Sequence, residues 1–453
     1  GLAPSSNRVQ GRGIVKHKWL FGLVAVLGLA SAQSTEVTLL FWPGPESEAM
    51  QKALDAYNSG QGKTDGVSVK QILFSREGYF DKELTDLAAG SKEFDMALVT
   101  TYTLGRYAPY LSPLDSYLNK QNLGAFIPSA VNSLNFGGKQ YGVPTDVSNH
   151  FTYYRKDLVD RLLKDTAWQA RYRQISQRVL GKALSPKPAD QWTWDDFMAT
   201  ALFFTKSLNP DSPTVYGAAL QMKNLLFNVM IWQSTLVSYG GNLYDKDGKP
   251  TIDSDAARKG LAVYTTLFKN RATPPGSTNY EYAEANEAFR GGQVATMLQW
   301  SAAFNELSDK EKSPQVFDKV ALAPMPAGPQ GHKTHVHSLG IGVNNASEKK
   351  DAAGKFMAWL GSEAAMKVYA EAGGLPPVGS VLRGLASKRP EFPLVADHIN
   401  KYGFVVNGGT AAYAVPVYTA LAQEFSAVWA GTKSVDDALK VATEAMTRLS
   451  TQK

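Results

Sequence analysis

The 453-residue sequence contains no cysteine. Disulfide bonds, thiol catalysis and a lipid attached to a cysteine are therefore excluded. Long apolar segments are scarce as well, because the run at 19–30 is shorter than the roughly 20 residues that a membrane-spanning helix needs. The sequence also lacks G-x-S-x-G, H-E-x-x-H and glycine-rich phosphate-binding motifs. Nothing in these patterns points to catalysis or to a bound cofactor.

The apolar run at 19–30 follows the basic residues 16–18 and precedes the small residues 30–32. This order is typical of a cleavable secretory signal peptide, so we predict that residues 1–32 are removed and that the mature chain begins near Gln33. A retained membrane anchor is the alternative. An exported protein without an anchor is best retained by an outer membrane, which favours a periplasmic, extracytoplasmic location.

An excess of either charge is also missing from the mature chain. The formal net charge of the whole sequence is +6, but residues 1–32 contribute Arg8, Arg12, Lys16 and Lys18 and no acidic residue, which leaves +2. A charge this small gives no reason to expect a nucleic-acid partner. The 44% hydrophobic and 19% charged residues are typical of a soluble globular protein, here long enough for two or three domains.

Strand and helix patterns alternate at the start of the mature chain. Apolar strand patterns at 36–42, 67–74 and 94–99 are separated by helix patterns at 45–58 and 79–90. This β-α-β-α-β order predicts an α/β domain of the doubly wound type. Residues 160–191 are predicted to form an inserted helix and a surface loop. A helix with Thr193 as its N-cap follows, and the rest of the chain is mainly helical. The predicted elements there are helices at 222–238, 254–269, 281–290, 348–360, 362–372, 411–430 and 434–449, and strands at 317–325 and 338–343.

Five separated stretches together resemble one protein family. They are KQYGVPTDVSNHFTYYRKDLV (139–159), WTWDDF (192–197), YGGNLYDKDGKPTIDSDAARKGLAVYTTL (239–267), EAFRGGQVATMLQW (287–300) and ASEKKDAAGKFMAWLGSEAAMKVY (346–369). In this order they resemble the bacterial extracellular solute-binding proteins of ABC importers, in the maltose-binding group. Two features depart from the family pattern near the first crossing between lobes. Arg155 stands where asparagine is usual, and the 160–191 insertion is long.

The resemblance implies a two-lobed periplasmic-binding-protein fold of type II, in which each lobe is a mainly parallel sheet flanked by helices. Residues 33–147 and 323–346 would form the N-terminal lobe, and residues 148–322 and 347–453 the C-terminal lobe. The lobes would close by a hinge motion on a carbohydrate ligand, and the closed form would be presented to the permease subunits in the membrane. We expect a monomer.

A sugar site needs aromatic faces for the C–H surface of the ring and polar groups for its hydroxyls. Trp300 follows a strand and falls on the tryptophan that stacks on sugar in relatives, with an ordinary core position as the alternative. Trp42 ends the first strand next to a helix start, where Glu46 would accept hydroxyl hydrogens, and a core position is equally open for this ring. Tyr102, after the third strand, is at a position that lines the cleft in relatives.

The resemblance adds further candidates for ligand contact. His337 lies in a family cleft segment, and Tyr413 aligns with a late aromatic residue for which helix packing is the alternative. The remaining candidates come from the first crossing and from a loop of the second lobe, and they are Asp146, Ser148, Asn149, Trp232, Tyr239 and Gly240.

Other functions remain open at this point. A secreted glycoside hydrolase would need two carboxylates facing one sugar. The HKTHVH segment (332–337) would suit a metal ion if His332, His335 and His337 converged, but no neighbouring carboxylate or cysteine adds a ligand, so we expect no metal site. A polyol or glycerol phosphate would replace the sugar in a similar cleft. Phosphate would call for a cleft cation, and Arg76, Arg106 and Arg155 are the candidates.

Overall fold

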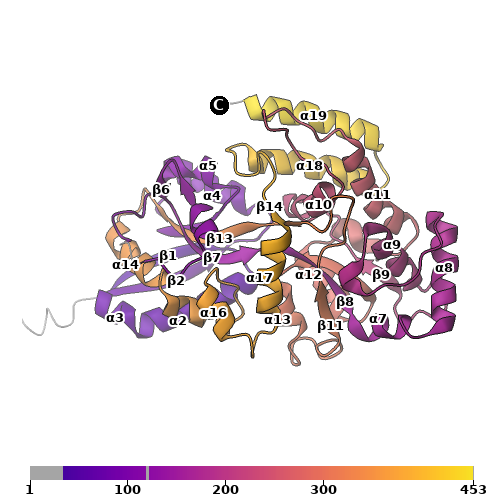
Figure 1. Ribbon diagram of the computed structural model, residues 1–453. Helices are drawn as coiled ribbons and strands as arrows, with labels where there is room; N and C mark the ends of the chain where they lie inside the picture. Colours follow the sequence, from indigo (N-terminus) through magenta and orange to yellow (C-terminus); the bar gives the residue numbers. More distant parts are fainter. Residues whose placement is uncertain (1–33, 119–121, 452–453) are drawn as a thin grey trace, which may run out of the picture.

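The computed structural model describes residues 34–118 and 122–451, and the predicted signal peptide at 1–32 lies outside this part of the chain. Two α/β lobes lie side by side, each built around its own sheet (Figure 1). None of the described helices combines the length and the apolar composition that crossing a membrane requires.

The first lobe contains a six-stranded sheet in which β2-β1-β3-β13-β4 is the strand order and β7 pairs with β13. The strands are β1 (Thr35–Phe41), β2 (Val67–Leu73), β3 (Met96–Thr100), β4 (Leu111–Ser112), β7 (Val143–Ser148) and β13 (His337–Asn344). Strands β1, β2 and β3 are parallel, as the predicted β-α-β-α-β order requires, whereas β13 runs antiparallel to β3, β4 and β7. The sheet is therefore mixed and not mainly parallel.

The second lobe has a four-stranded sheet of order β11-β8-β10-β9. Its strands are β8 (His150–Arg155), β9 (Tyr216–Ala219), β10 (Val294–Trp300) and β11 (Val320–Ala323). Only β9 and β10 pair in parallel, because β8 enters from the other lobe in the opposite direction and pairs antiparallel with both β10 and β11. This sheet too differs from the mainly parallel arrangement that the resemblance implies.

Helices cover both sheets, some packing directly on strands and others, such as α18 and α19, packing on other helices. The first lobe carries α2 (Pro45–Ser59), α3 (Gln61–Asp65), α4 (Tyr79–Ala88), α5 (Leu104–Tyr107) and α6 (Pro128–Asn132). The second carries α7 (Lys156–Leu162), α8 (Thr166–Leu180), α9 (Trp194–Phe203), α10 (Leu226–Ser238), α11 (Asp255–Lys269), α12 (Tyr282–Arg290), α13 (Ala303–Leu307), α18 (Ala414–Trp429) and α19 (Val435–Thr451). The predicted cap at Thr193 is present, because its hydroxyl accepts from Asp196 N and the Asp196 carboxylate accepts from Thr193 N.

Three segments connect the lobes. The first passes from β7 to β8 at Asn149, and the second passes from β12 (Thr334–His335) to β13 at Val336. The third follows α15 (Glu363–Glu371) and runs through α16 (Gly379–Gly384) to α17 (Glu391–Tyr402), which contacts β12 and β14 (Gly403–Phe404). The sequence places the second crossing near Ala323, but β11 pairs with β8 of the second lobe, and residues 324–335 stay with that lobe.

The lobe boundary after β13 also differs from the expected one. Helix α14 (Lys350–Leu360) packs on α3, β1, β2 and β13, and α15 packs on α2. Residues 350–371 therefore belong with the first lobe and not with the C-terminal lobe, to which residues 347–453 were assigned. An amphipathic helix pattern indicates that one face is buried but not which of two sheets buries it.

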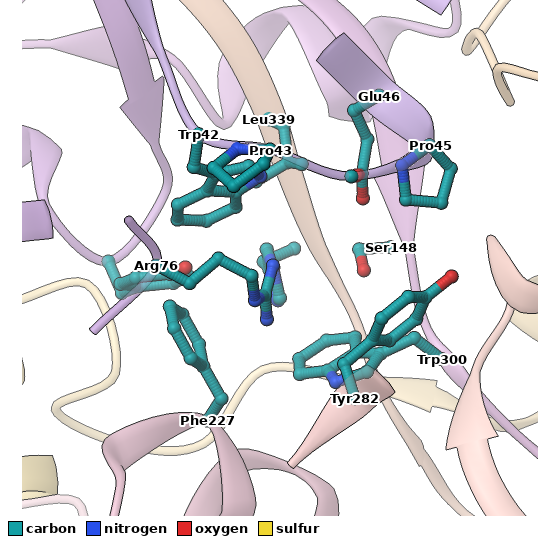
Figure 2. A pocket seen from close by; sticks show the side chains of 13 residues that line it. Trp42, Pro43, Pro45, Glu46, Arg76, Ser148, Phe227, Tyr282, Trp300 and Leu339 are labelled. Atoms are coloured by element: carbon teal, nitrogen blue, oxygen red, sulfur yellow. The ribbon is translucent and has the colours of Figure 1, made fainter. Parts of the chain in front are cut away.

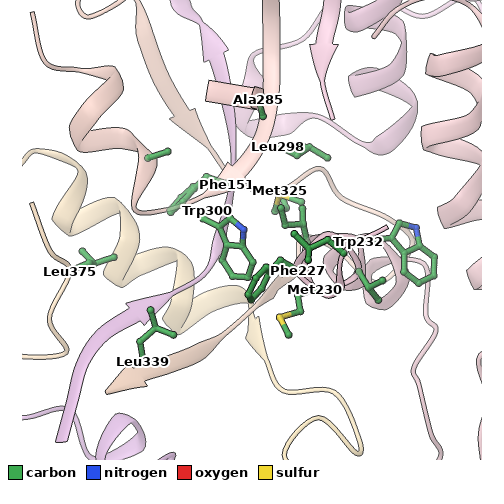
Figure 3. Packing of buried hydrophobic residues seen from close by; sticks show 14 of the residues in the cluster. Phe151, Phe227, Met230, Trp232, Ala285, Leu298, Trp300, Met325, Leu339 and Leu375 are labelled. Carbon is green, nitrogen blue, oxygen red and sulfur yellow. The ribbon is translucent and has the colours of Figure 1, made fainter. Parts of the chain in front are cut away.

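The core of the second lobe reaches the gap between the lobes through a layer of aromatic and sulfur-containing side chains. Figure 3 shows Trp300 in the same region as the buried side chains of Phe151, Phe227, Met230 and Met325. All five side chains are buried. The apolar core of the second lobe therefore extends as far as Trp300, the last residue of β10.

One buried carboxyl group makes the stability of the first lobe depend on pH. Glu83 in α4 is 0% exposed, and burial raises its pKa well above the ordinary value of 4.5, although the neighbouring hydroxyls of Tyr79 and Tyr107 oppose the shift. The folded state therefore keeps a proton that the unfolded chain releases above pH 4.5, so this group lowers the free energy of unfolding as the pH rises.

Replacing Glu83 by glutamine should remove this fall in the free energy of unfolding with rising pH. Above pH 4.5 the wild type should lose about 1.4 kcal/mol of unfolding free energy per pH unit from this group, and Glu83→Gln should be more stable at pH 8. Urea unfolding between pH 5 and 9 measures the difference. Glu48→Gln, at a 71% exposed side chain, is the control and should behave like the wild type. Parallel stability curves for Glu83→Gln and wild type would contradict the prediction.

Candidate functional site

A cavity lies between the two lobes beside the crossing segments. Both lobes contribute to its wall, and most of the side chains point into a common space (Figure 2). The lining residues are Trp42, Pro43, Gly44, Pro45, Glu46, Arg76, Tyr102, Ser148, Phe227, Tyr282, Trp300, His337 and Leu339.

The ends of strands and the beginnings of helices bring these residues together. Trp42 follows β1 directly, and after the turn Pro43-Gly44 the first turn of α2 presents Glu46. Pro45 is suited to the first helical position because its fixed backbone angle matches the helix and it needs no N–H partner there. Trp300 is the last residue of β10. Ligands of open α/β sheets bind at such carboxyl ends of strands.

The cavity wall combines aromatic rings with buried polar atoms that lack protein partners. The indole Nε1 atoms of Trp42 and Trp300, Oε2 of Glu46 and Nδ1 of His337 are all buried without a hydrogen bond to another described residue. A buried polar group without a partner costs about 1–3 kcal/mol. Two donors, an acceptor and an imidazole nitrogen gathered in one cavity therefore favour a ligand that carries several hydroxyl groups.

The charged groups of the cavity wall are Arg76 and Glu46, and Glu281 lies next to the wall as the ion-pair partner of Arg76. Burial raises the pKa of Glu46, and Arg76 opposes that shift. Arg76 Nε donates to Glu281 Oε1 at 2.9 Å, across the gap between the lobes. Although burial works against the positive charge, Glu281 and Glu46 raise the pKa of Arg76, which stays protonated. The single cation is thus already balanced by protein carboxylates.

Four histidines form a buried cluster behind the cavity, where the chain crosses between lobes. The ring centroids of His150 and His335 are 5.8 Å apart, those of His335 and His337 are 5.3 Å apart, and His398 Nε2 lies 2.9 Å from the carbonyl oxygen of His150. Trp300 contacts both His150 and His337, with centroids 4.2 and 5.3 Å away. The cluster joins the hinge to the aromatic wall of the cavity.

Burial keeps these imidazoles neutral. It lowers the pKa of His335 to about 3 and that of His398 to about 4, and it lowers the pKa values of His150 and His337 well below 6.5 with help from neighbouring histidines. For His337, Arg76 adds to the shift. Neutral imidazoles are hydrogen-bonding groups and not charges at physiological pH.

The first crossing places only one of its three predicted site residues in the cavity wall. Ser148 lines the cavity. The Asp146 carboxylate instead accepts from Tyr369 Oη at 2.7 Å and from Leu375 N at 3.0 Å, so it holds the third crossing against β7. The Asn149 side chain is buried at the crossing without a partner, outside the lining residues.

Four other predicted residues also lie outside the lining residues. Trp232 is fully buried in α10 against Phe425, and Tyr413 packs on Tyr244. Tyr239 and Gly240 follow the carboxyl end of α10, whereas the opposite end of this helix reaches the cavity. Twelve residues of helix separate the two ends by about 18 Å, so one helix cannot present both to the same ligand.

The structure adds two aromatic residues that the sequence alone did not single out. Phe227 and Tyr282 lie in the first turns of α10 and α12 and line the cavity from the second lobe. Both lie within helices that are recognisable in the sequence, and the available signal was an aromatic residue at the helix start. Arg76, considered only as a partner for phosphate, also lines the cavity, whereas Arg106 is exposed and Arg155 pairs with Asp157.

The HKTHVH segment does not gather its three histidines. His332 Nδ1 lies 2.7 Å from Met325 O, and its ring packs on Tyr402, whereas His335 and His337 belong to the buried cluster. Within residues 34–118 and 122–451, no three histidine or carboxylate side chains are placed to share a metal ion.

Two hinged lobes with a polar and aromatic cavity between them define a solute-binding protein. The chain belongs to the bacterial extracellular solute-binding protein family, whose sequence pattern matches residues 43–367. The resemblance found in the sequence and the two-lobed α/β fold are thus confirmed.

Known relatives share most of the chain. A binding protein of Brucella abortus is 27% identical over 356 residues, which is 76% of this chain and 77% of the relative. The mannitol-binding protein of Pseudomonas aeruginosa is 25% identical over 69% of this chain and 66% of its own length. A maltose-bound T. maritima protein superposes with a TM-score of 0.77 at 24% identity, covering 92% of this chain and 100% of that one.

The histidine cluster predicts a loss of stability in acid. A histidine whose folded-state pKa is lowered must take up a proton to unfold below pH 6.5, so the free energy of unfolding should fall between pH 6.5 and about 4. In His335→Gln and His398→Gln, this fall should be shallower by about 1.4 kcal/mol per pH unit for each histidine removed. Chemical unfolding followed by circular dichroism at several pH values measures the slope.

Tyr402→Phe is the matched control because it alters packing beside His398 without removing an imidazole. Its slope should equal that of the wild type. Histidine variants with an unchanged slope would show that the cluster is protonated or hydrated in the folded state.

Proposed function

We propose that the protein captures an uncharged carbohydrate, a mono- or oligosaccharide or a polyol, between its two lobes and delivers it to the permease of an ABC transporter. The observation that carries this proposal is the combination of Trp42 and Trp300 with unpartnered polar atoms in one interlobe cavity. Aromatic faces suit the C–H surface of a sugar or polyol, and the polar atoms suit its hydroxyls.

The relatives support the same class of ligand. One is named a mannitol-binding protein, and the T. maritima protein was solved with maltose bound. Capture would proceed by hinge closure, in which a tight ligand must prefer the closed arrangement by a few kcal/mol. The proposal includes export to the periplasm and action as a monomer that meets the permease subunits in its closed form.

A phosphorylated ligand such as glycerol phosphate is less well supported. Arg76 does lie in the cavity, but Glu281 and Glu46 already balance its charge. A dianionic phosphate would therefore face an excess of carboxylate. The cavity is better matched to a ligand without charge.

A glycoside hydrolase would need two carboxyl groups facing one sugar, about 5–9.5 Å apart. Among the described lining residues, Glu46 is the one carboxylic acid. Glu281 is engaged by Arg76, and Asp146 is engaged by Tyr369 and Leu375. This arrangement favours binding over hydrolysis.

Calorimetric titration of the mature protein with D-mannitol, glucose, maltose and maltotriose tests the proposal. At least one of these ligands should bind, and the bound ligand should be recovered unchanged after prolonged incubation. Glycerol 3-phosphate should bind more weakly than the best neutral ligand. The absence of binding to any neutral carbohydrate would overturn the proposal, and release of shorter sugars would favour a hydrolase.

Trp300 should be essential for affinity. In Trp300→Ala the affinity for the best ligand should fall at least tenfold, which is about 1.4 kcal/mol, because a stacking face and an N–H donor are both removed. Trp300→Phe should retain more of the affinity, since it keeps an aromatic face. Trp359→Ala, at a half-buried tryptophan in α14 outside the cavity lining, is the control. Equal affinities for wild type and Trp300→Ala would exclude Trp300 from the site.

A further inference from the structure

Arg76 occupies an unusual place in the cavity. It belongs to residues 74–78, the loop between β2 and α4 of the first lobe, yet its guanidinium group reaches aromatic rings of both lobes. Its Cζ lies 4.8 Å from the ring centroid of Trp42, 4.4 Å from that of Phe227 and 5.7 Å from that of Tyr282. In Figure 2 the side chain extends into the space between Trp42 and Phe227.

Ion pairs from two consecutive residues hold this loop against the second lobe. Arg76 Nε donates to Glu281, the N-cap residue of α12, and the next residue, Glu77, accepts from Lys223 Nζ at 2.6 Å. The two partners in the second lobe are themselves connected, because Lys223 N donates to Tyr280 O next to Glu281. The Arg76 side chain is only 16% exposed, so its pair with Glu281 is protected from solvent screening.

The position of the guanidinium group decides which aromatic faces a ligand can use. Cation–π contact with Trp42 and Phe227 already covers one side of the cavity. On the other side of Arg76, Figure 2 shows Glu46, Ser148 and Trp300.

From this geometry we infer that Arg76, anchored by Glu281, ends the cavity on its Phe227 side and restricts the ligand to a single sugar ring or a polyol of similar size. This inference rests on the proposed function and names its ligand more narrowly. Arg76 acts as a specificity-determining residue in two ways. Its side chain fills the space that a second sugar ring would need, and its charge compensates Glu46 and Glu281 so that an uncharged ligand meets a nearly balanced site.

The inference predicts a change in chain-length preference when Arg76 is shortened. The wild type should bind D-mannitol or glucose at least tenfold more tightly than maltose, because a disaccharide does not fit while Arg76 is in place. Arg76→Ala should raise the affinity for maltose relative to the better of the two smaller ligands by tenfold or more. Calorimetric titration of each variant with D-mannitol, glucose, maltose and maltotriose measures the ratio.

Three further variants separate the causes. Arg76→Met keeps most of the side-chain length without the charge, so it should preserve the chain-length preference. Arg106→Ala removes an exposed arginine of the same lobe and should leave every affinity unchanged. Glu281→Gln leaves Arg76 in place but weakens its anchor, and it should shift the ratio in the same direction as Arg76→Ala. If Arg76→Ala does not fold, Glu281→Gln alone decides the outcome.

The failures of the two proposals can be told apart. A wild-type protein that binds none of the four ligands overturns the proposed function and this inference with it. A wild type that prefers maltose or maltotriose overturns the inference alone. The inference is likewise overturned, with the proposed function intact, if the wild type binds a small ligand and the ratio is the same in the folded Arg76→Ala or Glu281→Gln variant.

Discussion

The antiparallel pairing of two crossing segments is the constraint on which the cavity depends. Ser148 of β7 and His337 of β13 are paired across the first sheet. One step further toward the second lobe, His150 N donates to Thr334 Oγ1, and the same hydroxyl donates to His150 O. Trp300 is paired with His150 in the second sheet. The hydrogen bonds of the hinge therefore determine how the residues of the cavity wall face one another.

This arrangement explains why so many polar atoms are buried near the hinge. Two chain segments that cross between lobes carry backbone groups that need partners, and the hydroxyls of Thr334 and Ser234 supply them. The imidazoles of His150 and His335 fill the space between these hydroxyls and the aromatic wall without bringing a charge. The crossing segments are therefore polar at the rear of the cavity without adding a charge there.

The sequence predicted the fold class, and six of the twelve residues predicted to contact the ligand line the interlobe cavity. Trp42, Glu46, Tyr102, Trp300 and His337 come from four separate segments, and the structure brings all of them to one cavity together with Ser148. Their common signal was a position at the end of a strand or the start of a helix. In an α/β sheet such positions meet at one edge whatever the details of packing.

The second crossing and the six predicted residues that lie outside the cavity wall depended on information that a periodic sequence pattern does not contain. An apolar strand such as β11 looks the same in either sheet, so the second crossing was placed near Ala323 and not at Val336. Trp232 lies on α10 and Tyr239 directly follows it, but the sequence pattern that predicted this helix does not say which of its ends faces the gap. From the sequence, Arg76 was considered only as a phosphate-binding residue. Its ion-pair partner, Glu281, is 205 positions away in sequence, so the pair could not be recognised there.

The placement of Arg76 on a loop has a consequence for how the family can diversify. Trp42 and Trp300 end core strands, so changing them disturbs packing as well as recognition. Residues 74–78 lie outside both sheets and are attached mainly through charged side chains. Substitutions there leave the strands of both sheets unchanged, although replacing Arg76 also removes a largely buried ion pair. A loop of this kind allows proteins that share this fold to differ in ligand specificity while their two sheets stay the same.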